Sequence, residues 1–441
     1  MISSSTPPPH DRDAAAGAIV DDREAGRFRV SRRVFSDPQI LLQEQQRIFA
    51  RCWLYLAHES EVPGRGSFVA RDIMGKSIVL SRDADGVLHA FHNACTHRGA
   101  QVCREKAGRS SVFSCPYHGW VFDIRGHLKD IPGREALPPQ AFEDGTLDLP
   151  RVPRLEAFKG FVFVCFDSGA PPLLDYLAQA ADYLAYVADH GPQGMEVVGS
   201  AQEYSAQANW KMLSENSYDG YHGVVTHSTY FDYIRARDGK APTRTMGAQG
   251  WVKNLGNGHA VGESIGVAGW GRPYARWVPG YGEDARPEIE ALASEIYGRL
   301  GPERGNVVVN GDRNLVIFPN LVVNDIMAVT IRTFYPSSAG RMQVNSWALA
   351  PVGESARSRD RRMKSFVEFL GPAGFATPDD IEMLESAQKT CEAYPETFND
   401  CSRGMRMERP SKTEELQLRT FWRRWAQLMS GSSDTSTLAG P

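Results

Sequence analysis

Two short motifs, each pairing a cysteine with a histidine, contain the side chains best suited to bind a metal. Cys95 and His97 stand in "CTHRG", and Cys115 and His118 stand in "CPYHGW", with seventeen residues between the two pairs. Thiolate sulfur and imidazole nitrogen bind both zinc and iron. Two arrangements are therefore open. All four side chains could hold one zinc ion, or the cysteines could hold one iron of a [2Fe–2S] cluster while the histidines hold the other.

The residues around the pairs favour the cluster. Gly99 closes the first motif, and Pro116 and Gly119 suit a tight turn around the second. Zinc ribbons, by contrast, usually separate the ligands of both pairs by two to four residues. The whole pattern, C-x-H-R-G followed by C-P-Y-H-G-W, resembles the Rieske signature. That resemblance implies a Rieske [2Fe–2S] cluster held by Cys95, His97, Cys115 and His118. Cys103 has no obvious partner, and we predict a thiol that is not a ligand.

A second group of potential ligands lies in "NSYDGYHGVVTH". His222 and His227 are five residues apart, which places them about 140° apart around a regular helix. Both rings reach one ion only if the helix is broken or bulged between them. The glycines on either side of this first histidine, Gly220 and Gly223, and the run "VVT" all disfavour helix. The sequence thus permits a metal site, although two packed, hydrogen-bonded histidines would give the same pattern.

Two histidines need a third ligand, and a carboxylate would complete a set suited to non-haem Fe(II). Asp379 and Asp380 stand at a predicted helix start, where acids also favour the helix dipole without any metal. Asp219 is the nearest acid in sequence. Spacing alone does not choose Asp380 over Glu382 or Glu215.

The elements that must position these side chains divide the chain. Short alternating segments such as "SFVARDI", "SIVLS" and "GFVFVCF" predict an all-β domain over residues 51–168. Helical periodicity then returns, followed by strands that include "DIMAVTIRTFYP", which we predict to be central. We expect an α+β protein in which residues 169–441 form a catalytic domain around an antiparallel sheet flanked by helices. Residues 1–50, a tail followed by a helix that starts with Ser36 as N-cap and Pro38, are expected to belong to that domain.

Composition excludes several classes of protein. The 441 residues are 42% hydrophobic and 23% charged, with a net charge of −4, so nothing favours nucleic acid or an anionic membrane as partner. No apolar run approaches the length of a membrane span. Seven irregularly spaced cysteines argue against a disulfide framework. The N-terminus lacks the layout of a signal peptide, so we expect a cytoplasmic protein.

Taken together, residues 40–430 resemble the α (oxygenase) subunit of Rieske non-haem iron ring-hydroxylating oxygenases. The resemblance rests on "CTHRG…CPYHGW", "NWKMLSENSYDGYHGVVTH", "GPAGFATPDD" and "LRTFWRRWAQLM". It implies that His222, His227 and Asp380 hold a mononuclear Fe(II). It further implies that Asp219 bridges an iron-bound histidine to the cluster ligand His118 of a neighbouring subunit, and that Asn216 is a polar residue beside the iron.

The resemblance also implies the activity and the partners. Electrons from an NAD(P)H-dependent reductase, with or without a ferredoxin, would reach the cluster and then the iron across a subunit boundary of a homotrimer. A small β subunit could complete an α3β3 assembly. Oxygen would then add to an aromatic ring as a cis-diol. A softer resemblance to p-cumate and substituted-benzoate dioxygenases implies an aromatic carboxylate as substrate, and Arg235 or Arg237 could pair with its carboxyl group unless both are merely surface residues.

Three other functions remain to be weighed. A Rieske monooxygenase or demethylase would use the same metal sites. A pure Rieske electron-transfer protein would explain the first 168 residues but not the second motif. A zinc-stabilised binding protein would contain no iron, whereas the oxygenase should contain about three irons per chain and the electron carrier two.

Overall fold

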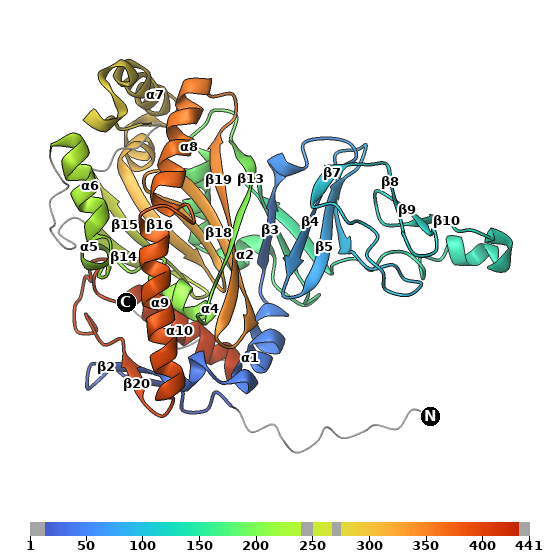
Figure 1. Ribbon diagram of the computed structural model, residues 1–441, viewed down its shortest axis with the longest axis horizontal. Coiled ribbons are helices and arrows are strands. Elements are labelled where there is room, and N and C mark those ends of the chain that lie inside the picture. Colours follow the sequence, from blue (N-terminus) through green and yellow to red (C-terminus); the bar gives the residue numbers. More distant parts are fainter. Residues whose placement is uncertain (1–13, 240–249, 267–274, 432–441) are drawn as a thin grey trace.

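The computed structural model describes residues 14–239, 250–266 and 275–431. Residues 1–13 of the predicted N-terminal tail lie outside these ranges. A body of sheet and helices carries, on one side, a β-rich part drawn in blue to cyan that extends away from it (Figure 1). The predicted α+β class is confirmed, and no helix in the described ranges is long and apolar enough to cross a membrane.

The body is built on an antiparallel seven-stranded sheet with the order β13-β19-β18-β17-β16-β15-β14. Its strands are β13 (Met195–Ala206), β14 (Gly250–Gly256), β15 (His259–Ile265), β16 (Gly311–Ile317), β17 (Leu321–Asp325), β18 (Val329–Ser338) and β19 (Arg341–Pro351). The segment "DIMAVTIRTFYP", predicted to be central, forms β18. It is an interior strand but not the middle one, because "LVVND" forms a separate strand, β17, at the centre.

Helices cover one face of this sheet. Helix α8 (Ala356–Leu370) packs on β18 and β19, where Phe366 contacts Ala328 and Ala348. Helix α9 (Ala376–Ala393) lies beside α8, and α4 (Trp210–Asn216) contacts both α9 and β18 (Figure 1). This helix-covered face is the one on which the second predicted ligand group lies.

The other face of the sheet meets the β-rich part. Trp347 of β19 packs edge-on against Tyr55, with ring centroids 6.0 Å apart. Tyr55 belongs to a small sheet of β11 (Arg154–Phe158), β12 (Phe161–Cys165) and β3 (Leu54–His58). One hydrophobic core runs through this contact and the body, while a second, smaller core surrounds Cys95 and Cys115 at the far end. A bipartite core of this kind lets the cluster motifs fold around their own apolar centre.

The β-rich part confirms the predicted short strands. It contains β4 (Ser67–Ile73), β5 (Lys76–Arg82), β6 (Leu88–His92), β7 (Ala107–Arg109), β8 (Val112–Ser114), β9 (Val121–Asp123) and β10 (Leu128–Asp130). The first Cys/His motif follows β6, and the second connects β8 to β9. Both motifs therefore stand in loops at strand ends.

The N-terminal and C-terminal segments close the body together. Strands β1 (Ile19–Asp22) and β2 (Arg27–Ser31) pair with β20 (Phe398–Asp400). Buried Glu44, in helix α1 (Pro38–Glu44), accepts a hydrogen bond of 2.7 Å from Trp425 of α10 (Leu416–Met429). The predicted N-cap Ser36 is wrong, because Asp37 caps α1 by accepting from the backbone N–H of Gln39. The division of the chain at residues 50 and 168 stays a prediction.

The remaining helices are α2 (Leu173–Leu177), α3 (Ala180–Ala188), α5 (Gly223–Thr226), α6 (Ser228–Asp238) and α7 (Arg286–Asn310). Of these helices, α3 and α7 contact β16 of the large sheet and α2 contacts β11. The helical periodicity that returns after residue 168 corresponds to two helices, α2 and α3, which are separated at Ala178, where φ is +47°.

Candidate metal centres

The two cluster loops share one backbone pattern. In each loop the N–H of the cysteine, Cys95 or Cys115, donates to the carbonyl oxygen five residues further on at 2.8 Å. The glycine four residues further on donates to the cysteine's own oxygen, at 2.7 Å in the first loop and 3.0 Å in the second. Those glycines, Gly99 and Gly119, have φ of +75° and +72°, a conformation that side chains with a Cβ resist. Two equivalent turns thus present two cysteines and two histidines to one space.

The four side chains differ in exposure. Cys95 and Cys115 are each only 3% exposed, whereas both histidines are half-buried. The rings of His97 and His118 lie 4.4 Å apart, and the buried Nδ1 of His97 has no hydrogen-bond partner in the described part of the chain. Burial raises the pKa of the Cys95 thiol, and the neighbouring Cys115 raises it further. A metal that stabilises both thiolates and takes the imidazole nitrogen fits this donor set.

The geometry favours a cluster over a single zinc ion. Zinc bonds of about 2.0–2.3 Å bring all four ligand atoms of one ion within a few ångströms of one another. Among the described residues, His222, His227 and Asp380 form a group whose ligand atoms all lie within 4.8 Å, and the four loop residues form none. The ligand atoms of the four loop residues are therefore spaced more widely than one zinc ion requires, and this spacing suits two irons.

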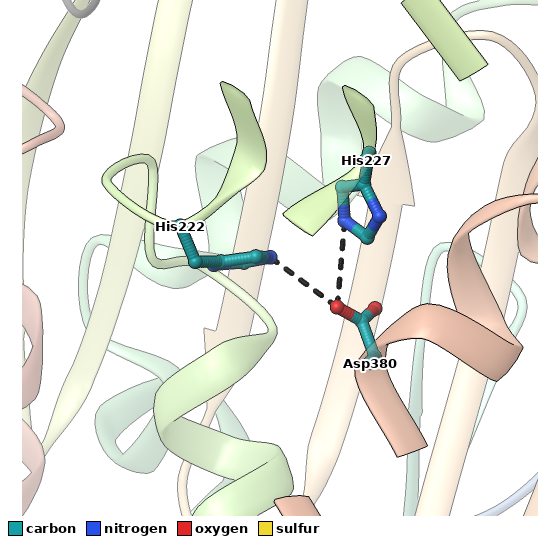
Figure 2. Close-up of side chains that lie close together, drawn as sticks. All are labelled: His222, His227 and Asp380. Atoms are coloured by element: carbon teal, nitrogen blue, oxygen red, sulfur yellow. Dashed lines mark ion pairs between the residues drawn. The ribbon is translucent and has the colours of Figure 1, made fainter. Parts of the chain in front are cut away.

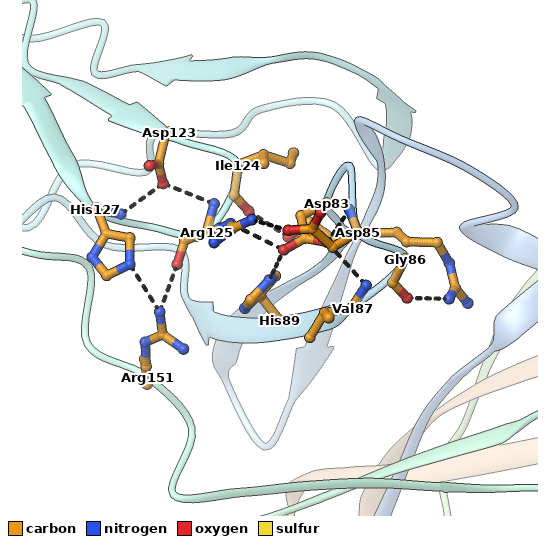
Figure 3. Close-up of polar contacts among 12 residues, drawn as sticks. Asp83, Asp85, Gly86, Val87, His89, Asp123, Ile124, Arg125, His127 and Arg151 are labelled. Atoms are coloured by element: carbon orange, nitrogen blue, oxygen red, sulfur yellow. Dashed lines mark hydrogen bonds and ion pairs between the residues drawn. The ribbon is translucent and has the colours of Figure 1, made fainter.

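A polar network fixes the hairpin that carries the second motif (Figure 3). Arg125, in the turn between β9 and β10, lies 3.0 Å from Asp83 Oδ2 and donates to Asp85 at 2.6 Å. Asp83 stands in the turn between β5 and β6 and also contacts His89 Nε2 at 2.8 Å. That hydrogen bond lowers the pKa of Asp83 to about 2. The β5–β6 hairpin, which precedes the first motif, therefore holds the β9–β10 hairpin, which follows the second motif.

The second predicted ligand group stands where helices are interrupted. Helix α4 ends at Asn216, so it does not reach His222. His222 directly precedes the single-turn helix α5, and His227 separates α5 from α6 with a non-helical ψ of 30°. The predicted break thus occurs at the second histidine. The segment 224–226, predicted to resist helix, is itself helical.

Three of the predicted side chains meet at one point (Figure 2). His222 Nε2 and His227 Nε2 each lie 3.4 Å from Oδ1 of Asp380, which comes from α9 and is 6% exposed. The alternative acids lie elsewhere. Glu215 accepts from Trp422 Nε1 at 2.6 Å, and Glu382 is exposed. Two imidazoles and one carboxylate leave open positions on an ion, as Fe(II) chemistry requires.

Asp219 and Asn216 support this group. Oδ2 of Asp219 lies 3.0 Å from Nδ1 of His222, which leaves Nε2 directed at Asp380. A carboxylate on the far nitrogen is the usual way to orient a metal-binding histidine. Asn216 Nδ2 donates to Asp380 Oδ1 at 3.1 Å, although the two residues are 164 positions apart. The Asp219 side chain is 20% exposed, so it reaches the surface.

Asp379 was not predicted to have a role of its own, yet its Oδ2 lies 3.5 Å from Nδ1 of His227. Each histidine thus has a carboxylate near its Nδ1 and Asp380 near its Nε2. The adjacent acids of the "DD" pair were the available signal, because consecutive residues at a helix start direct their side chains to different sides.

Charge holds the group together. Burial lowers the pKa of His222, but hydrogen bonds to Asp219 and Asp380 outweigh it and raise the pKa to about 10. Burial lowers the pKa of His227. For Asp380, burial raises the pKa, but the two histidines and Asn216 together leave it below its usual value. A divalent cation could replace the shared proton, since the donors already converge.

The two arginines predicted to pair with a substrate carboxylate already form ion pairs with acids of the chain. Arg235 pairs with Asp232 at 2.6 Å on the surface. Arg237 pairs with Asp238 at 2.7 Å and with Glu368 at 3.2 Å, beside a cavity of about 320 Å³ between α6 and α8. Protein carboxylates therefore already neutralise both. Cys103 is 6% exposed, and its thiol donates to the carbonyl oxygen of Glu105 at 3.3 Å. That Cys103 is not a ligand stays a prediction.

Two sequence families match the chain. The Rieske [2Fe-2S] domain matches residues 52–143, and the ring hydroxylating alpha subunit (catalytic domain) matches residues 195–431. The large subunit of 2-halobenzoate 1,2-dioxygenase from Burkholderia cepacia is 33% identical over 91% of this chain and 86% of its own. Toluate 1,2-dioxygenase subunit alpha from Pseudomonas putida is 34% identical over 88% and 84%.

A solved structure shows the same architecture. Naphthalene 1,2-dioxygenase from Rhodococcus sp., bound to indole, superposes with a TM-score of 0.80 at 28% identity, covering 92% of this chain and 95% of the other. The likeness therefore extends over the β-rich part, the large sheet and the helices that bring the second ligand group together.

Proposed function

Since this chain belongs to the ring-hydroxylating dioxygenase alpha subunits, the terminal oxygenase components that carry a Rieske [2Fe–2S] cluster and a mononuclear iron, we propose which residues perform each part of the reaction. Cys95, His97, Cys115 and His118 hold the cluster. His222, His227 and Asp380 hold the iron. When bound, the cluster supplies single electrons, and the iron supplies the site at which O2 is activated.

The observation that carries this assignment is the convergence of two histidines, one at each end of α5, with one carboxylate from α9. A helical turn delivers both rings, and the hydrogen bond from Asn216 keeps the carboxylate of Asp380 facing them. The electron-carrier alternative gives this buried group no task, and the zinc alternative leaves the Rieske match unexplained. Monooxygenation or demethylation would use the same residues, so the identity of the product decides between them.

Asp219 is proposed to link the mononuclear iron site to the cluster of a neighbouring copy of the chain. It contacts His222 Nδ1 on one side and reaches the surface on the other. His118 is likewise half-exposed at the edge of the cluster loops. A neighbouring copy that placed its His118 against Asp219 would join the two metal centres across a homotrimer interface, with or without a small β subunit. Electrons would come from an NAD(P)H-dependent reductase, directly or through a ferredoxin.

The proposed substrate is an aromatic carboxylate, converted to a cis-diol. Three of the relatives carry such compounds in their names: 2-halobenzoate, toluate and anthranilate dioxygenases. The cytoplasm is the proposed location, because all seven cysteines are free and buried, and thiols persist in reducing compartments.

Asp219→Asn tests the proposed link. The amide keeps the size of the side chain but removes the charge, so we expect turnover to fall about 10- to 100-fold, the usual cost of altering a ligand's support. The visible spectrum and the iron content of about three per chain should stay as in the wild type. Asp232→Asn, an exposed acid on α6, is the matched control. Full activity of Asp219→Asn would contradict the assigned role, and a loss in both variants would remove its specificity.

A further inference from the structure

The helix-covered face of the large sheet carries polar side chains that its surroundings do not satisfy. In the strand register, Arg332 of β18 stands opposite Ser346 of β19, which stands opposite Gln202 of β13. The buried atoms without a hydrogen-bond partner along this row are Gln202 Oε1, Tyr204 Oη, Thr330 Oγ1, Arg332 Nε and Ser346 Oγ. Buried polar groups are nearly always paired in folded proteins, so a cluster of unpaired ones indicates a binding site.

This row lies on the metal side of the sheet. Thr330 is paired in register with Ala348, which contacts Phe366 of α8. Helix α4 contacts β18 and, at its last residue Asn216, bonds Asp380. Burial raises the pKa of the Tyr204 hydroxyl, the charge of Arg332 and a side-chain hydrogen bond with Arg332 lower it, and the charge of Asp380 raises it. The hydroxyl is therefore within electrostatic range of both Arg332 and a proposed iron ligand.

Arg332 differs from Arg313 and Arg362, two other buried arginines of the body. Arg313 pairs with Glu263 and Asp325 at 3.0 and 2.8 Å. Arg362 pairs with Glu354 at 2.9 Å. Arg332, which is 3% exposed, donates from Nη2 to the neutral Asn324 Oδ1 at 2.9 Å and also interacts with the Tyr204 hydroxyl, but it has no acidic partner within the described ranges. The segments 240–249 and 267–274, outside those ranges, contain no Asp or Glu that could pair with it.

A buried guanidinium without a counter-charge is costly, and its retention indicates a negative partner that the described part of the chain does not supply. A guanidinium binds a carboxylate through two parallel hydrogen bonds, which favours a flat, two-oxygen anion. The unpartnered Nε and a second hydrogen of Nη2 are available for such a pair. The hydroxyl groups of Tyr204 and Thr330 can donate to the same anion.

We propose that Arg332 binds the carboxylate of the aromatic substrate and thereby sets the preference for aromatic acids. This inference rests on the proposed function, because it assumes that the substrate ring lies at the iron. It replaces Arg235 and Arg237 as candidates, since acids of the chain already hold those two. With its carboxyl group held on the sheet, a benzoate has one fixed end, so the ring presents a defined edge to the metal group.

The test compares binding of two probes, benzoate and the neutral benzamide, by calorimetry on iron-loaded protein. Wild-type protein should bind benzoate more tightly. In Arg332→Met, we expect the dissociation constant for benzoate to rise about 100-fold, as for loss of charge-assisted hydrogen bonds, and that for benzamide to change about threefold or less. Arg237→Met is the matched control and should bind benzoate as the wild type does. Arg332→Lys, which keeps the charge without the fork, should recover part of the affinity.

A purely structural role for Arg332 predicts a different pattern. The unliganded Arg332→Met variant would then have a lower melting temperature, and both probes would lose affinity equally. Either this pattern or unchanged benzoate binding overturns the inference. We expect instead no fall in the unliganded melting temperature, because the variant removes an unpaired buried charge.

If wild-type protein oxygenates toluene while Arg332→Met binds benzoate normally, the inference fails and the proposed function stands. If no aromatic compound is oxygenated, the proposed function fails, and the binding comparison still decides whether Arg332 recognises carboxylates.

Discussion

The cluster loops and the mononuclear group assemble their ligands in opposite ways. The cluster residues all lie between Cys95 and His118, in two loops with the same pair of backbone hydrogen bonds. The mononuclear group joins the two ends of α5 to α9, and its supporting contact from Asn216 to Asp380 spans 164 positions. A site built from neighbouring residues is recognisable as a motif. A site built from distant elements is recognisable only once those elements pack.

The two regions also differ in access. The histidines of the cluster loops are half-buried at the end of the β-rich part, where a partner can approach. His227 and Asp380 are 7% and 6% exposed beneath helices. Exposure suits a group that exchanges electrons with other proteins, and burial suits one that must keep water from an oxygen reaction.

Asp380→Ala should have the largest effect and should separate the two regions. The variant removes the carboxylate on which both imidazoles converge, so iron should fall from about three to about two per chain, with turnover reduced more than about 100-fold. The visible spectrum of the cluster should remain. Metal analysis, absorption spectroscopy and product analysis measure the three quantities.

The matched control is Asp379→Asn, one residue away on the same helix. Its Oδ2 approaches His227 Nδ1 only to 3.5 Å, so we expect full iron and a loss of activity below about tenfold. Loss of the cluster spectrum in Asp380→Ala would show that the two regions are not independent.

Gly119→Ala should weaken the cluster loops alone. Gly119 has φ +72°, and an added Cβ would lie 3.1 Å from Pro132 Cγ. The left-handed conformation costs about 1–2 kcal/mol with a side chain, and the contact must also shift the loop. We therefore expect reduced cluster content, measured by absorption per chain, with the mononuclear iron retained.

Gly86→Ala is the control for this substitution. Gly86 has φ +80°, and an added Cβ meets nothing within 4 Å. Gly86→Ala should lower the free energy of unfolding by a similar amount without lowering the cluster content per chain. Equal cluster loss in both variants would mean that general destabilisation, and not the geometry of the loop, controls cluster binding.

The contrast between the regions explains what the sequence could predict. The strand "SFVARDI" coincides with β4, because short β-hairpins keep their alternation and turns local. The cluster motif and its two glycines were readable for the same reason. Asp380, however, could not be chosen from spacing. The resemblance selected it, and the packing of α9 against α4 is what brings it to the histidines.

Each error has its own physical cause. The segment 224–226 forms α5 despite its β-branched residues, because contacts around His222 override local propensity. Strand β17 was missed because a strand buried on both faces has no alternation to read. Arg332 lies in the strand predicted to be central, and no sequence pattern signals that its guanidinium has no acidic partner among the described residues.

Lowering the pH should also distinguish the β-rich part from the body, and this is the smallest of the expected effects. In the β-rich part, the His89 hydrogen bond holds the pKa of Asp83 at about 2, so that carboxylate stays charged at pH 5. In the body, burial lowers the pKa of His259 to about 4. The neutral ring lies between the Phe318 N–H, which donates to its Nδ1 at 2.9 Å, and the carbonyl of Tyr176, 2.7 Å from its Nε2. Protonation of Nδ1 would break the first bond.

The sign of the expected change follows from these values. Unfolded His259 takes up a proton near pH 6.5, while the folded ring resists until about pH 4, so its contribution is present above 6.5 and is lost as pH falls to 4. The loss is about 3 kcal/mol in total and about 2 kcal/mol by pH 5. Glu215, whose pKa burial raises to about 7, acts in the opposite direction.

The measurement is therefore the difference between wild type and His259→Gln in denaturant unfolding at pH 7 and pH 5. The wild type should lose about 2 kcal/mol more than the variant, while the visible circular dichroism of the cluster stays constant. An equal loss in both proteins would assign the acid sensitivity to another group, and early loss of the cluster signal would place it in the β-rich part.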